Sequence, residues 1–187
     1  MYIAHVREKD QTIQSLREHL HGVKVLAEQF GEKLGLKHVA GLAGLLHDVG
    51  KYSDEFQEYI SNATFHPERQ NKIRGQVDHS TAGGKLLYSE LHQSTSTGYE
   101  KQLSEIVSNS IISHHSNLHD YLSPDVESPF LKRVTEKELQ GYSQAITRFF
   151  EDAMAESEFN TYLAMAVDEL KQVTDRTPTQ SFFLTNL

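Results

Sequence analysis

Histidine and aspartate residues recur in this sequence at positions that suit a metal centre. The first is the adjacent pair His47–Asp48, which follows an apolar stretch of the chain. Further histidines follow at His79 and in the doublet His114–His115. One His–Asp pair occurs by chance in many proteins, whereas imidazoles and a carboxylate on separate apolar segments predict a shared metal site.

Helical phase brings a fifth imidazole, that of His19, into consideration. His19 lies three residues after Leu16 and four before Val23, on the apolar stripe of a predicted helix. It is therefore expected to face inward. His21 shares the polar face with Lys24, so we expect it to be solvated and the substitution His21→Ala to be nearly silent in catalysis.

The residue types available as ligands limit which metals the site could hold and which reaction they would support. Cysteine is absent from the chain, so a metal must be held by histidine and carboxylate groups, which favour Mn, Fe, Co or Ni over Mg. The two oxygens of Asp48 can bridge two cations. Two metals roughly 3.5–4 Å apart suit the hydrolysis of a phosphate ester. Lys51, four residues after His47, can share its helical face, although a lysine at such a position is more often solvated.

Length and charge limit the number of domains and the kinds of partner that the chain could have. The 187 residues are most economically one domain, spanning 1–187, with a substantial core. A formal charge of −8 disfavours a protein that binds nucleic acid tightly by its own basic surface. No apolar run approaches membrane-spanning length and the N-terminus lacks a signal-peptide core, so we expect a cytoplasmic protein without a membrane partner.

The elements that must position these residues are helices, and the predicted fold class is all-α. Apolar residues repeat at threes and fours in most of the chain. The predicted helices cover residues 16–34, 39–50, 53–60, 78–91, 103–114, 135–150 and 159–173. Residues 61–77 are predicted to be a loop, and Thr135 with Glu138 forms a plausible capping box. No convincing strand alternation is present.

Taken together, the motifs resemble the HD superfamily and, more narrowly, the HD nuclease domain of the type I CRISPR-associated helicase–nuclease. The matching segments lie in order within residues 15–120. They are Glu18-His19-Leu20, Gly44-Leu45-Leu46-His47-Asp48-Val49-Gly50-Lys51-Tyr52-Ser53, Asp78-His79-Ser80-Thr81-Ala82-Gly83 and Ser113-His114-His115-Ser116-Asn117-Leu118. As a set they are specific, although each one alone is weak.

The resemblance implies an HD-domain helical bundle with a metal site between its helices. It implies one metal on His19, His47 and Asp48, a second on Asp48, His79, His114 and His115, and Lys51 beside the scissile phosphate. The implied activity is that of a metal-dependent deoxyribonuclease directed at single-stranded DNA in antiviral defence. Its implied partners are a helicase domain or subunit, which supplies the DNA, and a guide-RNA surveillance complex. Delivery of the DNA by a helicase agrees with the net negative charge of the chain, because a nuclease supplied in this way needs little affinity of its own for DNA.

One departure concerns a late helix, where the family places a further metal-ligand Asp. Asp168 is the only nearby candidate, but its helical phase puts it at the edge of the apolar stripe and its flanks do not match. The apolar residues 182–187 resemble the start of another helix. We therefore expect the chain to be the N-terminal part of a longer helicase–nuclease, cut before that Asp, with a weak first metal site.

Two other functions remain open. An HD phosphohydrolase acting on nucleotides or other small phosphate esters needs the same His47–Asp48 pair and one or two metals. A non-catalytic helical docking module would use the histidines structurally, and its thermal stability would be indifferent to chelators and to Asp48→Ala. The nuclease is the preferred interpretation because the motifs occur as an ordered set.

Overall fold

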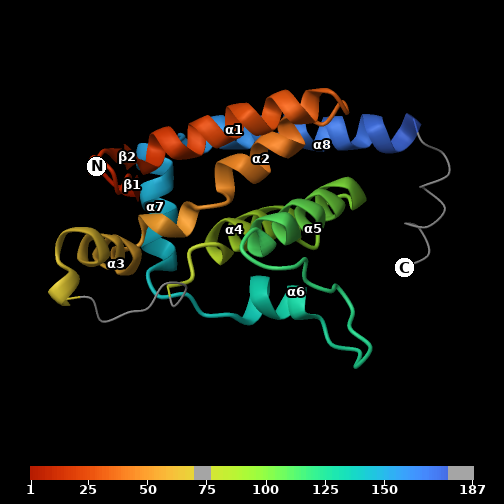
Figure 1. Cartoon of the computed structure of the whole chain (residues 1–187). Helices are drawn as coiled ribbons and strands as arrows, with labels where there is room; N and C mark the ends of the chain where they lie inside the picture. The colour runs from red at the N-terminus through yellow and green to blue at the C-terminus, as the bar shows by residue number, and fades with distance from the viewer. Residues whose placement is uncertain (70–76, 177–187) are drawn as a thin grey trace.

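The computed structural model describes residues 1–69 and 77–176, and within them the fold is helical (Figure 1). The α-helices are α1 (Leu16–Glu32), α2 (Lys37–Leu46), α3 (Asp54–Phe65), α4 (Thr81–Leu91), α5 (Gly98–Ser113), α6 (Pro129–Leu131), α7 (Tyr142–Asp152) and α8 (Glu156–Arg176). Shorter helical turns are η1 (Val49–Tyr52), η2 (Pro67–Arg69) and η3 (Lys132–Glu136). The all-α class is confirmed. None of the described helices is both long and apolar enough to cross a membrane.

A small antiparallel sheet, which the sequence did not predict, precedes the first helix. Strands β1 (Ile3–Val6) and β2 (Ile13–Ser15) are too short to show a clear alternation of apolar residues. The Gln57 side chain ties β1 to α3, because it accepts a hydrogen bond from Ile3 N at 2.9 Å and donates one to Ile3 O at 3.0 Å. The position of this sheet therefore depends on a contact across 54 residues of sequence.

Helix α1 begins at a capping box. The Ser15 hydroxyl accepts a hydrogen bond from Glu18 N, and the Glu18 carboxylate accepts one from Ser15 N, each at 3.3 Å. The predicted apolar stripe is buried only in its first half, at Leu16 and Leu20. Phe30, near the end of the helix, is 60% exposed. The residues that position His19 are therefore the first turns of α1.

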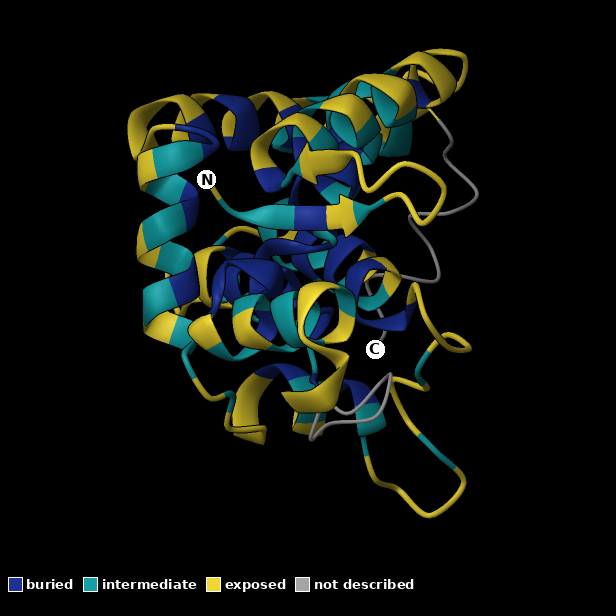
Figure 2. Ribbon diagram, turned by 60° about the vertical axis from the view of Figure 1, so that its left-hand side comes forward, coloured by how far each residue is buried: buried dark blue, intermediate teal, exposed yellow. Residues whose placement is uncertain are grey.

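The core lies between two helical layers, and α2 is its central element. Helix α1 packs on α2, α4 packs on α5, and α8 lies against both α2 and α5. Leu42, Leu45 and Leu46 of α2 are fully buried, which explains the continuous apolar sequence before His47. Figure 2 shows the buried residues concentrated on the inner faces of these helices. The chain thus places the end of α2 inside the molecule.

Several predicted boundaries are wrong. Thr135 and Glu138 do not form a capping box, because residues 132–136 make a π-helical turn and α7 begins only after Gly141. Gly141 has a φ of +73°, a left-handed conformation that redirects the chain into α7. The predicted loop at residues 61–77 begins later than expected, since α3 continues to Phe65. Residues 70–76 and 182–187 lie outside the described part of the chain.

Gly22 offers a direct test of the α1 assignment. It lies within the helix, is exposed, and a Cβ added there meets nothing within 4 Å. Gly22→Ala is therefore expected to raise the free energy of unfolding by about 0.5–1 kcal/mol, measured by urea denaturation. A loss of stability would contradict helical backbone at this position.

Candidate metal centre

Asp48 lies at the centre of the predicted ligands. It lies between α2 and the turn η1, directly after His47, and is only 3% exposed. Its Oδ2 atom lies 3.0 Å from His19 Nε2, 3.1 Å from His47 Nε2 and 2.9 Å from Lys51 Nζ. The end of α2, the first turns of α1 and the turn η1 are thus joined at one carboxylate oxygen.

The other oxygen of Asp48 faces a second set of imidazoles. Asp48 Oδ1 lies 3.5 Å from His114 Nε2 and 3.6 Å from His79 Nε2. It is buried and accepts no hydrogen bond from the described residues. An unsatisfied buried carboxylate oxygen is costly, and a bound cation is a common way to satisfy it.

Local backbone contacts set the tautomers of three histidines. The Nδ1 atoms of His47, His79 and His114 lie 2.8, 3.2 and 2.7 Å from the carbonyl oxygens of Gly44, Val77 and Ile111. Because a carbonyl only accepts, each Nδ1 is assigned the proton and each neutral ring presents the lone pair of Nε2. In the neutral rings those lone pairs face Asp48, so electron-pair donors converge on one space. A divalent metal fits such a donor set.

The electrostatics of the cluster also suit a metal. Burial opposes ionisation of Asp48, but the neighbouring His114, His19 and His47 rings hold its pKa far below the usual range. Burial lowers the pKa of His79 and of His115, which keeps both rings neutral near pH 7. Burial also opposes the charged form of His114, but Asp48 raises its pKa overall. A metal would replace that proton, because a ligating imidazole is neutral.

Two overlapping groups of residues satisfy the spacing of a metal site. In each group the ligand atoms all lie within 4.8 Å of one another. One consists of Asp48, His79, His114 and His115, which are the four residues that the resemblance implied for the second metal. The other consists of His5, His19 and Asp48. Asp48 belongs to both, so its two oxygens can serve two ions.

His5 is the functional candidate that sequence reasoning missed. His5 is exposed, yet its ring lies 4.7 Å from the His19 ring, and the partial burial of its imidazole lowers its pKa to about 4. The sheet brings it there through β1, so no helical spacing pointed to it. Lys51 also differs from the solvated alternative, because it is 4% exposed and donates a hydrogen bond to Ala4 O at 3.3 Å.

Glycines let the segments that carry the site approach at backbone distance. A Cβ on Gly50 would lie 2.5 Å from His79 O, and a Cβ on Gly83 would overlap the carbonyl oxygen of Leu46. The turn after Asp48 therefore touches the backbone of His79, and α4 touches the end of α2. These contacts set the spacing between Asp48 and His79.

The prediction for His21 is wrong, and Asp168 lies outside both groups of ligands. His21 is not solvated, because it is partly buried and its Nε2 donates a hydrogen bond to Ala153 O at 2.8 Å. Helical phase within α1 could not reveal this contact, which α7 supplies. Asp168 is exposed on α8 and belongs to neither group of ligands. Its neighbour Glu169 instead accepts hydrogen bonds from His38.

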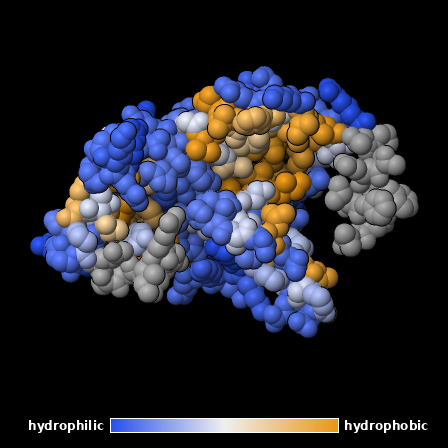
Figure 3. Space-filling view, in the orientation of Figure 1, coloured by the Kyte–Doolittle hydropathy of each residue, from blue (hydrophilic) through white to orange (hydrophobic). Residues whose placement is uncertain are grey.

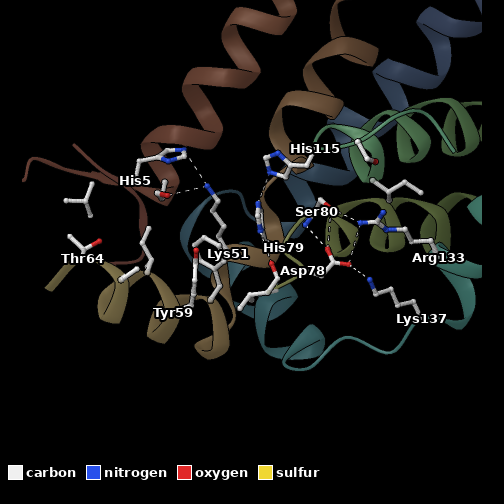
Figure 4. A pocket seen from close by; sticks show the side chains of 18 residues that line it. His5, Lys51, Tyr59, Thr64, Asp78, His79, Ser80, His115, Arg133 and Lys137 are labelled. Carbon is white, nitrogen blue, oxygen red and sulfur yellow. Dashed lines mark hydrogen bonds and ion pairs between the residues drawn. The ribbon is translucent and has the colours of Figure 1, made fainter. Parts of the chain in front are cut away.

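The cluster borders two cavities. One, of about 720 Å³, is lined by His5, Lys51, His79 and His115 and is shown in Figure 4. The other, of about 540 Å³, is an apolar groove between α1, α2 and α5 that includes His47 and His114. The apolar surface that is prominent on one face of the molecule in Figure 3 includes exposed residues of α1. Of the two cavities, the first has the more polar lining.

Comparison with known proteins agrees with this arrangement. The family model described as HD domain matches residues 16–156, three quarters of the chain. No curated protein matches the chain significantly. The matched region contains the His47–Asp48 pair and four of the five histidines of the two ligand groups, lacking only His5. Together, the helical fold, the Asp48-centred cluster and the family match show that this chain belongs to the HD domain family.

Proposed function

We propose that this HD protein is a metal-dependent nuclease that hydrolyses phosphodiester bonds of single-stranded DNA. HD domains are typically metal-dependent hydrolases of phosphate esters, and the His/Asp cluster is compatible with divalent metal ions. The observation that carries the proposal is the unsatisfied Oδ1 of Asp48, buried among imidazole lone pairs. The more specific role rests on the ordered motifs of the sequence.

The residues of the cluster would have different roles in binding metal and substrate. Asp48, His79, His114 and His115 would hold one ion, and His19 and His47, with His5 nearby, would supply ligands for another on Asp48 Oδ2. The metal supplies Lewis acidity and activated water at neutral pH. Lys51 lines the cavity and neutralises Asp48, so its ammonium lies where a phosphate would approach the cluster. The imidazole tautomers keep their lone pairs directed at the site without reorganisation.

We extend the proposal to partners, as the resemblance implied. A helicase domain or subunit would supply single-stranded DNA, and a guide-RNA surveillance complex would recruit the pair in antiviral defence. The support is the charge of −8, which leaves the chain little general affinity for DNA. Delivery of the DNA by another protein would compensate for this low affinity.

A second candidate is a phosphohydrolase that acts on nucleotides or other small phosphate esters. The cavity beside His79 has a volume of about 720 Å³, which is also enough for a mononucleotide. The two functions share the metal centre and differ in substrate. Turnover of mononucleotides without cleavage of single-stranded DNA would favour this candidate.

Metal removal and restoration test the proposed function. Protein stripped by a chelator is expected to be inactive on circular single-stranded DNA, and Mn, Ni or Co, added separately, should restore cleavage better than Mg. Mn is also expected to stabilise the fold, by about 2.7 kcal/mol at a hundredfold excess over its Kd. Gel electrophoresis and thermal denaturation give the two readouts.

The outcomes separate the candidates. Linearisation of the circle establishes endonuclease cleavage, whereas turnover confined to mononucleotides supports the phosphohydrolase. Failure of every metal to restore hydrolysis or to change stability would contradict a metal-dependent function. That last result is the one expected of a structural docking module.

A further inference from the structure

The cavity beside the cluster has a charge opposite to that of the whole chain. Although the chain carries a formal charge of −8, the cavity lining contains Lys51, Arg133 and Lys137 against the single carboxylate of Asp78. A concave surface with one sign of charge focuses the field and attracts ligands of opposite charge. Because Lys51 already pairs with Asp48 at 2.9 Å, the cavity favours an anion at Arg133 and Lys137.

Two of these cations meet at the end of the cavity formed by α4 and η3. Lys137 Nζ lies 2.6 Å from Asp78 Oδ2, and Arg133 Nη2 lies 3.5 Å from the same oxygen. Arg133 also donates to Thr81 Oγ1 at 2.8 Å and to Ser80 Oγ at 3.0 Å, which fixes its guanidinium. One carboxylate cannot neutralise both cations. The Lys137 side chain is 43% exposed, so its ammonium is accessible to a further anion.

The opposite side of the cavity is aromatic. The Phe56 ring lies 5.0 Å from the His79 ring, and the Tyr59 ring lies 5.9 Å from that of Phe56. Both aromatic residues come from α3 and line the cavity. Phe56 is only 5% exposed, so the partly exposed Tyr59 is the ring that offers a face on which a nucleic-acid base stacks. In Figure 4, His79 lies between Tyr59 on one side and Arg133 and Lys137 on the other.

We infer that this cavity binds single-stranded DNA on both sides of the metal centre. A base would lie against Tyr59, with Phe56 packed beside that ring, and a neighbouring backbone phosphate would contact Lys137 and Arg133. The inference rests on the proposed function, because it places the hydrolysed phosphate between these sides, at His79. A substrate that extends in both directions is an internal phosphodiester. A terminal phosphate monoester would fill one side only.

Binding without cleavage tests the inference. The probe is a fluorescein-labelled thymidine oligonucleotide of about 12 nucleotides, added to the full chain in EDTA and followed by fluorescence anisotropy. Lys137→Gln is expected to weaken binding about fivefold at low salt and to reduce the slope of log K against log salt by about 0.7, the effect of one lost phosphate contact. Tyr59→Ala is expected to weaken binding about tenfold with an unchanged slope.

Matched variants control for charge and folding. Lys132 is half exposed, pairs with Glu127 at 2.7 Å and does not line the cavity, so Lys132→Gln should bind as the wild type does. Tyr59→Phe keeps the ring and should restore binding. Equal affinity and equal salt slope for Lys137→Gln and Lys132→Gln would overturn the inference. It would also fail if thymidine monophosphate bound as tightly as the oligonucleotide.

A parallel cleavage assay separates this inference from the proposed function. Metal-restored cleavage of single-stranded DNA, with no effect of Lys137→Gln or Tyr59→Ala on binding, would leave the nuclease and remove this binding site. The expected binding pattern without cleavage in any metal would keep the binding site and remove the nuclease.

Discussion

Asp48→Ala is expected to reduce metal-dependent hydrolysis by roughly 1,000-fold or more, because Asp48 is the ligand that both candidate metal groups share. Loss of any other single ligand leaves one group intact, so its effect should be smaller. His79→Gln is expected to cost about 100-fold. Initial rates on single-stranded DNA at saturating Mn provide the measurement, and metal content per chain provides a second readout.

Stability must be measured alongside activity for Asp48→Ala. Lys51 is 4% exposed and pairs with Asp48 at 2.9 Å, so removal of the carboxylate leaves a buried ammonium unpaired at a cost of about 3–5 kcal/mol. His79→Gln keeps that pair and tests ligation in a folded protein. His66→Ala, an exposed change outside the cluster, serves as the control and should keep full activity. Equal activities of His79→Gln and His66→Ala would contradict the assignment of the centre.

The second large effect is expected from a single methyl group. Gly83→Ala places a Cβ against the carbonyl oxygen of Leu46, which is backbone and cannot rotate away. Helix α4 must then separate from α2, so we expect a loss of about 3 kcal/mol or more in the free energy of unfolding. Urea denaturation followed by circular dichroism gives the value. Any folded fraction should also bind metal more weakly, because His79 lies just before α4.

Gly22→Ala is the matched control for this experiment. Both glycines lie in helices, but Gly22 has open space around it. The helix-propensity term favours alanine at both positions, so a difference between the variants reports the contact at Leu46. Similar stabilities of the two variants would show that α2 and α4 are not in backbone contact.

The parts of the fold that sequence predicted best are the ones with strong helical periodicity. Helix α2 has apolar residues on all sides because Leu42, Leu45 and Leu46 are fully buried, and its apolar run identified the inward end at His47. The inward position of His19 followed from its helical phase relative to Leu16 and Val23. The structure brings these histidines together with Asp48, although their role as ligands stays a prediction.

The remaining features depend on contacts between distant segments, which periodicity does not record. His5 reaches the site through a short sheet held by Gln57, and His21 is covered by Ala153, 132 residues away. The predicted capping box at Thr135 failed because the chain forms a π-helical turn there and Gly141 redirects it into α7. In each case a tertiary contact or a backbone conformation outweighed a local pattern.

The hydrogen bonds that orient the imidazoles have a consequence for protein design. His47, His79 and His114 each donate to a carbonyl only two or three residues earlier in the chain. The orientation of each ring is thus set by a hydrogen bond within its own short segment of chain and not by a polar partner from a distant segment. Such segments are transferable: a different helical scaffold that reproduces their backbone separations would reproduce the directions of the lone pairs as well.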